Sequence, residues 1–469
     1  MNLKHDYKLR QQDEERIASF VSEDPTLGFA EDHPQFTPIY LNKIGIDYEP
    51  EVLGRAYIKL MWSDFIVEEI TASNRIITIE PKEEEHFEQM NEEKPKTEAD
   101  LVKQGMATFE VAEKLAEVLN SPISDISFAG LKDAKAITAQ EISFNGLLPS
   151  DLAKVNISNM FLKNIHQRKG VVERGSLSGN RFTIHLRCDP VDQAELDKKI
   201  EEINKEGFYN FYSLQRFGTR MLTHETGLLV LQEKYDDAVK IFLVGQSPHE
   251  LKVFQKIRMN AAQYWGNWDE MFNIFSRLPY FFYNELAMVE ELKKSKGDFT
   301  KALSACQEQV RMAAYAYFSY WFNKLLSYLI NNNLEIPETL PLLRPRDEIR
   351  ELYKFVMPAE EMKLIKFHHP DLLFLSLNRL TDVPTKIKPH IWSATRTETG
   401  YVIHFDLDKG SYATTMLVEI FHLYQGKPVP DWVNQTKVDT RAMLGYEPVE
   451  LTEMRFPGLS EDKVEVELE

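Results

Sequence analysis

Two stretches of the chain alternate apolar and polar residues with a period of two. In RFTIHLR (181–187), Phe182, Ile184 and Leu186 alternate with polar residues, and GYVIHFDLD (400–408) alternates in a similar way. Such alternation is typical of strands that bury one face. We therefore expect two half-buried strands, and shorter alternating runs predict strands in DISFAG (125–130) and AQEISF (139–144).

Other parts of the chain space their apolar residues as helices do. FEVAEKLAEVLN (109–120) places Val111, Leu115 and Val118 on one stripe and ends before a Ser-Pro turn. From about residue 235 to 387 long apolar helical patterns dominate, such as VRMAAYAYFSYWFNKLLSYLINNN (310–333). A strand-rich part interrupted by a more helical part predicts an α+β architecture.

Length and composition narrow the class of protein. A chain of 469 residues favours two packed units, and 43% hydrophobic with 27% charged residues is typical of a soluble globular protein. No apolar run approaches the roughly 20 residues that span a bilayer. The first 20 residues also lack the apolar centre of a secretion signal. We expect a cytoplasmic protein.

Motifs for metals and nucleotide cofactors are missing from the sequence. Cys188 and Cys306 are far apart, and the pair His368 and His369 lacks the spacing of metal ligands, so a loop before Pro370 is the favoured interpretation. Neither glycine-rich phosphate-binding fingerprint is present. We therefore expect chemistry that uses side chains alone, with no cofactor and no metal.

The net charge is 55 − 73 = −18, which argues against a surface that binds nucleic acid everywhere. Residues 78–100 hold nine acids against three lysines, and the tail 461–469 holds five acids against one lysine. We expect both segments to be solvated and mobile. Residues 151–187, by contrast, hold seven basic residues against two acids, which predicts one basic face on an acidic protein.

The stretch FAGLKDAKAITAQ (128–140) lies between two of the predicted strands, so Lys132 and Asp133 should lie in a connecting loop. An aspartate there can cap backbone N–H groups in a turn, or it can be a reactive carboxylate on a rigid scaffold. The adjacent Lys132 would favour its ionised form.

A second stretch, YNFYSLQRFGTR (209–220), mixes aromatic residues with Gln215, Arg216 and Arg220. Aromatic faces stack on unpaired bases and guanidinium groups bind phosphates, so the stretch suits a site for an unstacked nucleotide. An edge strand with core aromatics and solvated arginines fits the pattern equally well.

Five segments, in order along the chain, resemble the motifs of the TruD family of tRNA pseudouridine synthases. They are SDFIVEEI (63–70), FAGLKDAKAITAQ (128–140), RGSLSGNRF (174–182), NFYSLQRFG (210–218) and LDKGSYATTMLVEI (407–420). The chain departs from the family pattern at Ser213, Asp408, Val418 and Phe318, which replace glycine, proline, arginine and glutamine. These departures leave the Lys-Asp pair intact and bear on which RNA is chosen.

The resemblance implies an isomerase that converts a uridine of tRNA, at position 13, to pseudouridine by flipping the base, without a cofactor. Asp133 would be the catalytic residue, supported by Lys132, Glu69 and Asn210, with a Glu69–Lys132 contact. Whether Asp133 attacks the sugar or removes a sugar proton is left open. Tyr212 and Tyr412 would stack on the flipped uracil. The basic residues expected to contact RNA are Lys163, Arg168, Lys169, Arg174, Arg181 and Arg216.

The same resemblance implies a discontinuous catalytic domain with a mixed, mainly antiparallel sheet, formed by residues 1–234 and 386–469. A family-specific α/β insertion domain would occupy about 235–385. We expect a monomer with tRNA as its partner. Two alternatives stay open at this point: an RNA-binding protein of the same fold that lacks catalysis or acts on another RNA, and a glycosidase-like hydrolase that uses Asp133 with Glu69.

Overall fold

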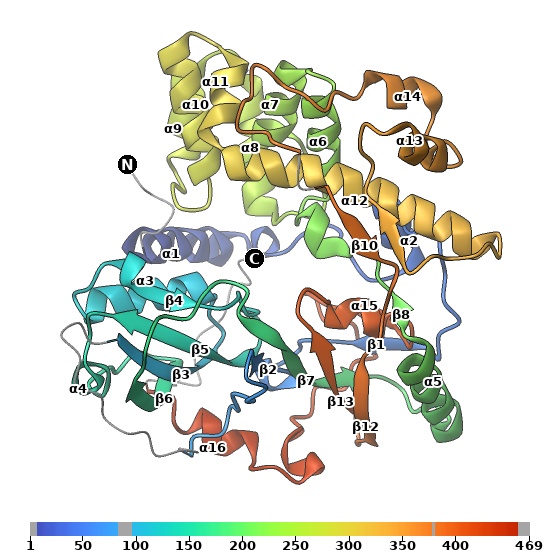
Figure 1. Ribbon diagram of the computed structural model, residues 1–469. Coiled ribbons are helices and arrows are strands. Elements are labelled where there is room, and N and C mark those ends of the chain that lie inside the picture. The colour runs from blue at the N-terminus through green and yellow to red at the C-terminus, as the bar shows by residue number, and fades with distance from the viewer. Residues whose placement is uncertain (1–6, 83–95, 378–379, 458–469) are drawn as a thin grey trace. The chain divides into compact units, whose positions relative to one another are not determined.

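The computed structural model describes residues 7–82, 96–377 and 380–457, which fold as two compact units. The sheet unit comprises the described residues of 52–208 and 388–457, and the helical unit comprises those of 7–51 and 209–387. Figure 1 shows the elements of both. Each unit is described separately below.

A ten-stranded sheet forms the centre of the sheet unit. Seven strands lie in the order β12 (His390–Arg396), β13 (Gly400–Asp408), β7 (Leu177–Arg187), β2 (Phe65–Thr71), β5 (Ile137–Asn145), β3 (Lys96–Gln104) and β6 (Met160–Gln167). Off this path lie β1 (Arg55–Tyr57), β14 (His422–Tyr424) and β4 (Ile126–Phe128). Within this sheet β2–β5 and β1–β14 pair in parallel and the other described pairs are antiparallel, which confirms the predicted α+β fold with a mixed sheet.

The strands predicted at 181–187 and 400–408 are present as β7 and β13, paired from Gly400↔Arg187 to Asp408↔Gly179. The expectation that they bury one face only is wrong, since nearly all of β13 and the second half of β7 are buried. Their polar residues are inside because they have partners: the Thr183 hydroxyl lies 2.9 Å from His404 Nδ1, and His185 Nδ1 lies 3.1 Å from Asp64 Oδ1. Hydrogen bonding offsets the cost of burying such groups.

The sheet has two faces, which we call front and back. Side chains alternate along β2, so Phe65, Val67 and Glu69 point to the front and Ile66 and Glu68 to the back. Helix α3 (Thr108–Val118) covers part of the front face, where its apolar stripe packs on Leu101, Ile142 and Phe144. The C-terminal segment 433–456 with α16 (Val449–Glu453) covers part of the back face through Val449 and Phe456. Figure 1 shows α3 and α16 on opposite sides of the sheet.

The acidic segment 78–100 is not solvated at its described ends. Ile79 is buried, and residues 96–100 form the start of β3, where Glu98 and Asp100 are also buried. The guanidinium of Arg75 lies 2.8 Å from Asp100 and 3.4 Å from Glu98, which compensates the two carboxylates. Residues 83–95 and the acidic tail 461–469 lie outside the described residues.

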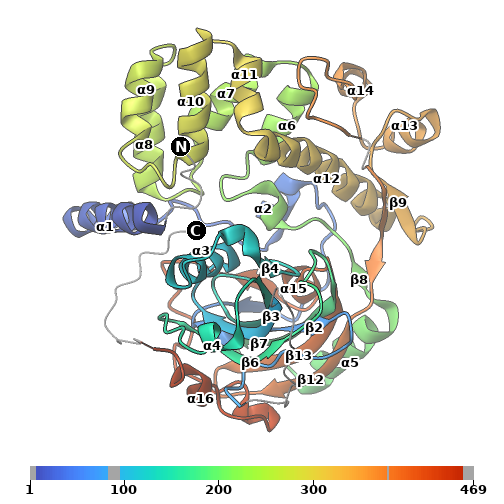
Figure 2. The same cartoon turned by 60° about the vertical axis from the view of Figure 1, so that its left-hand side comes forward.

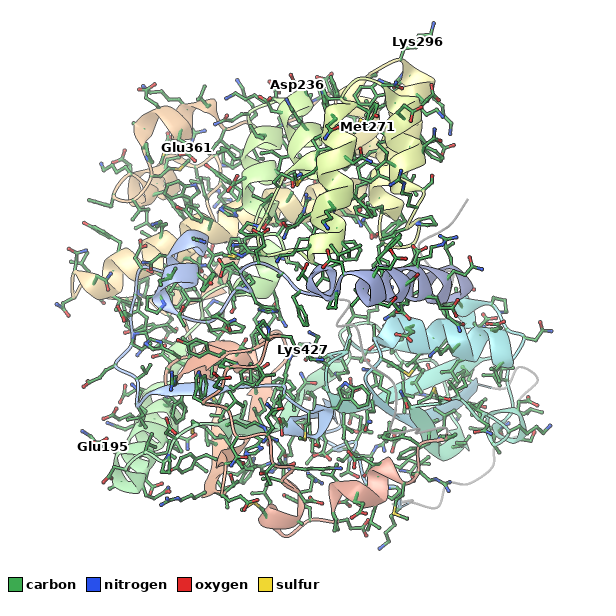
Figure 3. The ribbon with its side chains drawn as sticks, turned by 180° about the vertical axis from the view of Figure 1, so that it is seen from behind. Glu195, Asp236, Met271, Lys296, Glu361 and Lys427 are labelled. Atoms are coloured by element: carbon green, nitrogen blue, oxygen red, sulfur yellow. The ribbon has the colours of Figure 1, made fainter. Side chains whose placement is uncertain are left out.

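The helical unit is built around the long helix α12 (Gln307–Asn331), which confirms the helix predicted at 310–333. The other helices of this unit are α1 (Tyr7–Glu23), α2 (Pro38–Leu41), α6 (Thr223–Leu231), α7 (Tyr235–Val244), α8 (Lys252–Gln263), α9 (Trp268–Phe275), α10 (Tyr283–Ser295), α11 (Phe299–Ala305), α13 (Asp347–Tyr353) and α14 (Ala359–Leu364). A small sheet pairs β9 (Thr339–Pro341) with β10 (Asp382–Pro384). Figure 2 shows α8, α9 and α10 side by side. In Figure 3, Lys296 projects beyond the end of α10, which it terminates in a left-handed conformation.

The helical unit takes in more of the chain than residues 235–385, because α12 binds two segments that precede that range. The side-chain amide of Asn323 donates to the carbonyls of Ile44 and Tyr212, and its oxygen accepts from the Tyr212 N–H at 2.9 Å. Helix α6 also approaches α12 closely at Gly227, where an added Cβ would lie 2.0 Å from the Ala313 carbonyl oxygen. Residues 7–51 and 209–234 therefore fold with the helices.

The remaining helices belong to the sheet unit: α4 (Pro149–Leu152), α5 (Gln193–Glu206) and α15 (Ala413–Leu417). Cys188 and Cys306 are buried free thiols. Among the described helices, none combines the length and the apolar character that crossing a bilayer requires.

Candidate active site

The loop that holds Lys132 and Asp133 joins β4 to β5, which pair antiparallel with Phe128 opposite Ile142. The predicted strand–loop–strand arrangement is therefore confirmed. Three hydrogen bonds fix the loop: the Lys132 N–H donates to the Thr108 hydroxyl (3.0 Å), that hydroxyl donates to Gln140 Oε1 (3.1 Å), and Gln140 Nε2 donates to the Gly130 carbonyl (3.1 Å). The first turn of α3 and the front of β5 thus hold the loop together.

Lys132 points to Glu69 of β2. Its Nζ lies 2.6 Å from Glu69 Oε2, and the two side chains are 3% and 1% exposed. The predicted Glu69–Lys132 contact is present. Burial raises the pKa of Glu69 above its ordinary value, and the charge and hydrogen bond of Lys132 act in the opposite direction. The pair ties the loop to the centre of the sheet.

Asp133 points to a different lysine. Lys59 Nζ donates to Asp133 Oδ1 at 2.7 Å, and the Asp133 side chain is 29% exposed. Burial alone would raise the pKa of Asp133, but the charge and hydrogen bond of Lys59, with the charge of Lys103, hold it below the ordinary value. Asp133 is therefore ionised at neutral pH. Lys132 was expected to favour this ionised form, but it is engaged by Glu69, and Lys59 and Lys103 supply the positive charges instead.

Sequence reasoning missed both Lys59 and Lys103. Lys59 adopts a positive φ of 58° just before the SDFIVEEI segment, and its Nζ lies 4.1 Å from the centre of the Phe65 ring. Lys103 Nζ donates to the Asp133 carbonyl oxygen at 2.9 Å. The position of Lys59 beside a recognised motif is the one sequence signal that could have drawn attention to it.

Two further motif segments meet the loop. The Gly175 N–H donates to the Ala129 carbonyl at 2.7 Å, which joins RGSLSGNRF to the Lys-Asp loop. The Lys409 N–H donates to the Ser178 carbonyl at 2.9 Å, and Lys409 Nζ donates to the Gly175 carbonyl at 3.2 Å. Three segments that are distant in sequence therefore converge. Tyr412, three residues after Lys409, is the residue that precedes α15 and is 37% exposed.

The basic residues predicted to contact RNA differ in exposure and in their partners. Lys163 is 2% exposed and donates to the Thr78 hydroxyl at 3.1 Å, and Arg168 forms an ion pair with Glu98. Arg181 donates to both carboxylate oxygens of Asp406, at 2.7 and 2.8 Å.

The sheet register places Arg181 opposite Glu68, and Lys163 opposite Asp100, so these residues point to the back face. Asp133 and Glu69 lie on the front. Burial and acidic partners argue against direct phosphate contacts by Lys163, Arg168 and Arg181. Lys169 and Arg174 are exposed, and Arg174 adjoins Gly175 at the Lys-Asp loop.

Asn210, Tyr212 and Arg216 belong to the helical unit. Asn210 Nδ2 donates to the Pro384 carbonyl at 2.9 Å. The Tyr212 ring has the Arg216 guanidinium 5.3 Å from its centre and the edge-on ring of Phe322 at 5.5 Å. Ser213, which replaces the family glycine, has φ −86° and needs no glycine. The approach of these residues to Asp133 stays a prediction.

The chemistry available here is that of a partly exposed, ionised carboxylate. Such a group can attack an electrophilic carbon or stabilise a cationic sugar. Among the described residues, no three His, Cys, Asp or Glu side chains gather so that they could hold a metal ion.

The mixed sheet, with a Lys-Asp loop on its front face, places this chain among the pseudouridine synthases. A family model described as tRNA pseudouridine synthase D (TruD) matches residues 52–341. The chain therefore belongs to the tRNA pseudouridine synthase D (TruD) family, as its five motifs predict, and the family is one of isomerases.

Individual relatives agree with the family. A probable tRNA pseudouridine synthase D of Methanopyrus kandleri is 28% identical over 341 residues, 68% of this chain and 84% of the relative. The probable tRNA pseudouridine synthase D 1 of Methanocaldococcus jannaschii is 27% identical over 408 residues, 81% of this chain and 98% of the relative. A crystal structure from Methanosarcina mazei, described as tRNA pseudouridine synthase D (TruD), matches with a TM-score of 0.58 and 23% identity, covering 83% of this chain and 98% of that one. At this level of identity, the similarity to the crystal structure is evidence for the fold alone.

Proposed function

We propose that this protein isomerises a uridine of tRNA, at position 13, to pseudouridine, with Asp133 as the catalytic residue. The observation that carries the proposal is the partly exposed Asp133 carboxylate, which Lys59 keeps ionised on a loop fixed to α3 and β5. Family membership supports the reaction and the substrate class.

The reaction breaks the N1–C1′ bond of the nucleotide and forms a C5–C1′ bond after the base has turned. In one route the Asp133 carboxylate attacks C1′ as uracil leaves with the bonding electrons, and the carboxylate leaves again when C5 attacks. In the other route the carboxylate removes the C2′ proton as uracil leaves with the bonding electrons, which gives a glycal. C5 then bonds to C1′ as the proton returns to C2′. Each route ends with loss of the C5 proton and gain of a proton at N1, and each requires Asp133 to be ionised at the start. The contact with Lys59 supports that state.

The target uridine has to leave its stack to reach Asp133, which costs a few kcal/mol. Stacking of the flipped uracil on Tyr412 and Tyr212 would offset this cost, with Asn210 as a hydrogen-bonding partner and Arg216 holding a phosphate. Among the other basic candidates we retain Lys169 and Arg174 as phosphate contacts, because both are exposed. Lys409 joins them, since it is exposed and bound to the same loop as Arg174.

Glu69 is a poor second carboxylate for a hydrolase. Its side chain is 1% exposed and paired with Lys132, so it has no room to activate a water molecule. This weighs against the glycosidase-like alternative. The intact Lys-Asp loop likewise favours catalysis over RNA binding alone.

One assay separates these functions. A tRNA transcript with labelled uridine is incubated with the protein and digested to nucleosides. We expect pseudouridine at position 13, and none in a transcript that carries cytidine there. Free uracil would indicate a hydrolase, and unchanged uridine in a bound tRNA would indicate a binding protein.

We further propose that the protein acts as a monomer in the cytoplasm. Sedimentation at working concentration tests the first point: a dimer mass would contradict it. Fractionation of cells tests the second.

A further inference from the structure

A completely buried lysine lies beneath the catalytic loop. Lys103, near the end of β3, is 0% exposed, and its Nζ donates to two main-chain carbonyls: that of Asp133 at 2.9 Å and that of Met106 at 2.6 Å. Lys103 pairs with Thr138 on β5, and Thr138 pairs with Val67 on β2. Because paired residues point to the same side, Lys103 points to the front face. It is therefore on the side of the sheet where Asp133 lies.

The turn after Lys103 is itself part of this junction. The Gly105 N–H donates to the Ala136 carbonyl at 3.2 Å, at the far end of the catalytic loop. Gly105 has φ +64°, and an added Cβ would lie 2.7 Å from the Trp62 ring, so only glycine fits. Lys103 and Gly105 thus bind the loop from below at two points.

A buried ammonium group is costly, and a methionine of similar length would fill the same space without that cost. The charged groups that face Lys103 are Asp133 and Lys132 on the loop and Glu110 on α3. Burial lowers the pKa of Lys103 to about 7, although the charges of Asp133 and Glu110 act to raise it. An ionisable side chain therefore stands where an apolar one would be less costly to bury, and this points to a role in the reaction.

We propose that Lys103 is a positioning residue that holds the main chain of Asp133 in place and supplies the Asp133 carboxylate with a second positive charge besides Lys59. The inference rests on the proposed function of Asp133. Lys103 makes its hydrogen bond to the carbonyl of Asp133 and not to its carboxylate, so the carboxylate is left to Lys59 and the nucleotide.

The pH dependence follows from this arrangement. Lys103 is charged below a pH of about 7 and loses its charge as the pH rises through that value, so the catalytic rate should fall on the alkaline side. The charge of Lys103 also lowers the pKa of Asp133, so its removal should shift the acidic limb of the rate profile to higher pH.

The test uses the full chain and a tRNA transcript. We compare kcat and KM across pH for the wild type, Lys103→Met, which loses donor and charge, and Lys103→Gln, which keeps a donor. Lys198→Met is the matched control, since the Lys198 side chain on α5 is 78% exposed and its ion pair is with Glu202 of the same helix. Melting temperatures are measured alongside.

We expect Lys103→Met to lower kcat about tenfold with little change in KM. It should abolish the alkaline limb near pH 7 and raise the acidic limb, and its melting temperature at pH 7 should be equal or higher. Lys103→Gln should lose the alkaline limb but keep more of kcat, and it decides the matter if the methionine variant does not fold. Lys198→Met should match the wild type.

A wild-type rate and pH profile in both Lys103 variants would overturn the inference, as would a loss of rate that follows a lower melting temperature with an unshifted profile. Asp133→Asn separates this result from failure of the proposed function. If Asp133→Asn is inactive while the Lys103 variants are normal, only the role of Lys103 is rejected. If Asp133→Asn is as active as the wild type, the proposed function itself fails.

Discussion

The two faces of the central sheet both bury charged residues, but they bury them in different ways. On the back face Arg187 is 0% exposed and binds both oxygens of Asp64 at 2.8 Å, and Arg441 contacts Glu68 and Glu80. These are arginine–carboxylate pairs within the sheet and its C-terminal cover. On the front face, Lys132 and Lys103 bind the catalytic loop to the sheet, and the Asp133 side chain is 29% exposed.

The difference indicates a division of labour. Arginine pairs carboxylates through two parallel hydrogen bonds and keeps its charge at all relevant pH values, so it suits a fixed ion pair. Lysine is a point charge whose pKa shifts on burial, and it leaves part of the carboxylate available. We infer that the back face holds the fold and the front face performs the chemistry, and the following predictions challenge that distinction.

The largest effect is expected on the back face. Arg187→Met would leave Asp64 without its bidentate partner, and the carbonyls of Asn434 and Thr436 without their donor. Breaking a buried pair costs about 3–5 kcal/mol in the free energy of unfolding. Denaturant unfolding measures this loss, with the exposed Lys198→Met as a neutral control. The kcat of the protein that remains folded should be unchanged, and a catalytic defect in that fraction would undo the distinction between the faces.

The next effect is on the front face. Lys59→Met should lower kcat about a hundredfold, the size expected for loss of one preorganised electrostatic contact. Lys59 holds the pKa of Asp133 below its ordinary value, so the wild type should lose activity only when the pH falls through that lowered pKa. In the variant the acidic limb should move to higher pH. The measurement is a pH–rate profile, and a variant whose acidic limb stays in place would show that Lys59 does not act on Asp133.

A smaller effect is expected from the hydroxyl that fixes the loop. Thr108→Val removes the acceptor of the Lys132 N–H and the donor to Gln140 without changing the side chain's shape. A loop displaced by a fraction of an ångström should cost roughly tenfold in kcat. Thr108→Ser keeps the hydroxyl and should restore most of the rate. Equal rates for valine and serine would mean that these hydrogen bonds do not position the loop.

The smallest effect concerns RNA binding. Lys169→Ala with Arg174→Ala should weaken tRNA binding a few-fold at low salt and reduce the slope of log K against log salt by about 1–2. Lys198→Ala with Lys205→Ala on α5 is the matched control, since both of these side chains are more than three-quarters exposed. An equal change of slope in both pairs would remove Lys169 and Arg174 from the proposed surface.

The sequence predicted the strands, the long helix and the contact between two motifs more completely than the lysines that act on Asp133. Local periodicity is enough to find β7, β13 and α12, and the motifs were enough to place Glu69 beside Lys132. Lys59 and Lys103 were missed because they lie 74 and 30 residues from Asp133, and only the folded sheet brings them together.

The basic run 151–187 shows that local composition also misses the partners that the fold brings to a segment. A local count of charges predicted a basic face, but strand pairing supplies acids from elsewhere: Glu98 of β3 to Arg168, and Asp406 of β13 to Arg181. Local composition therefore overestimated the number of exposed basic residues without acidic partners in this run. Exposed residues on connecting loops, such as Lys169 and Arg174, escape this pairing.

The central claim is that the front-face carboxylate of Asp133 performs the reaction. Asp133→Asn keeps the size of the side chain and removes its charge, so single-turnover formation of pseudouridine in a tRNA transcript tests the claim directly. We predict no pseudouridine above background in the variant, with tRNA binding and melting temperature close to those of the wild type. Pseudouridine formed at the wild-type rate would contradict the account.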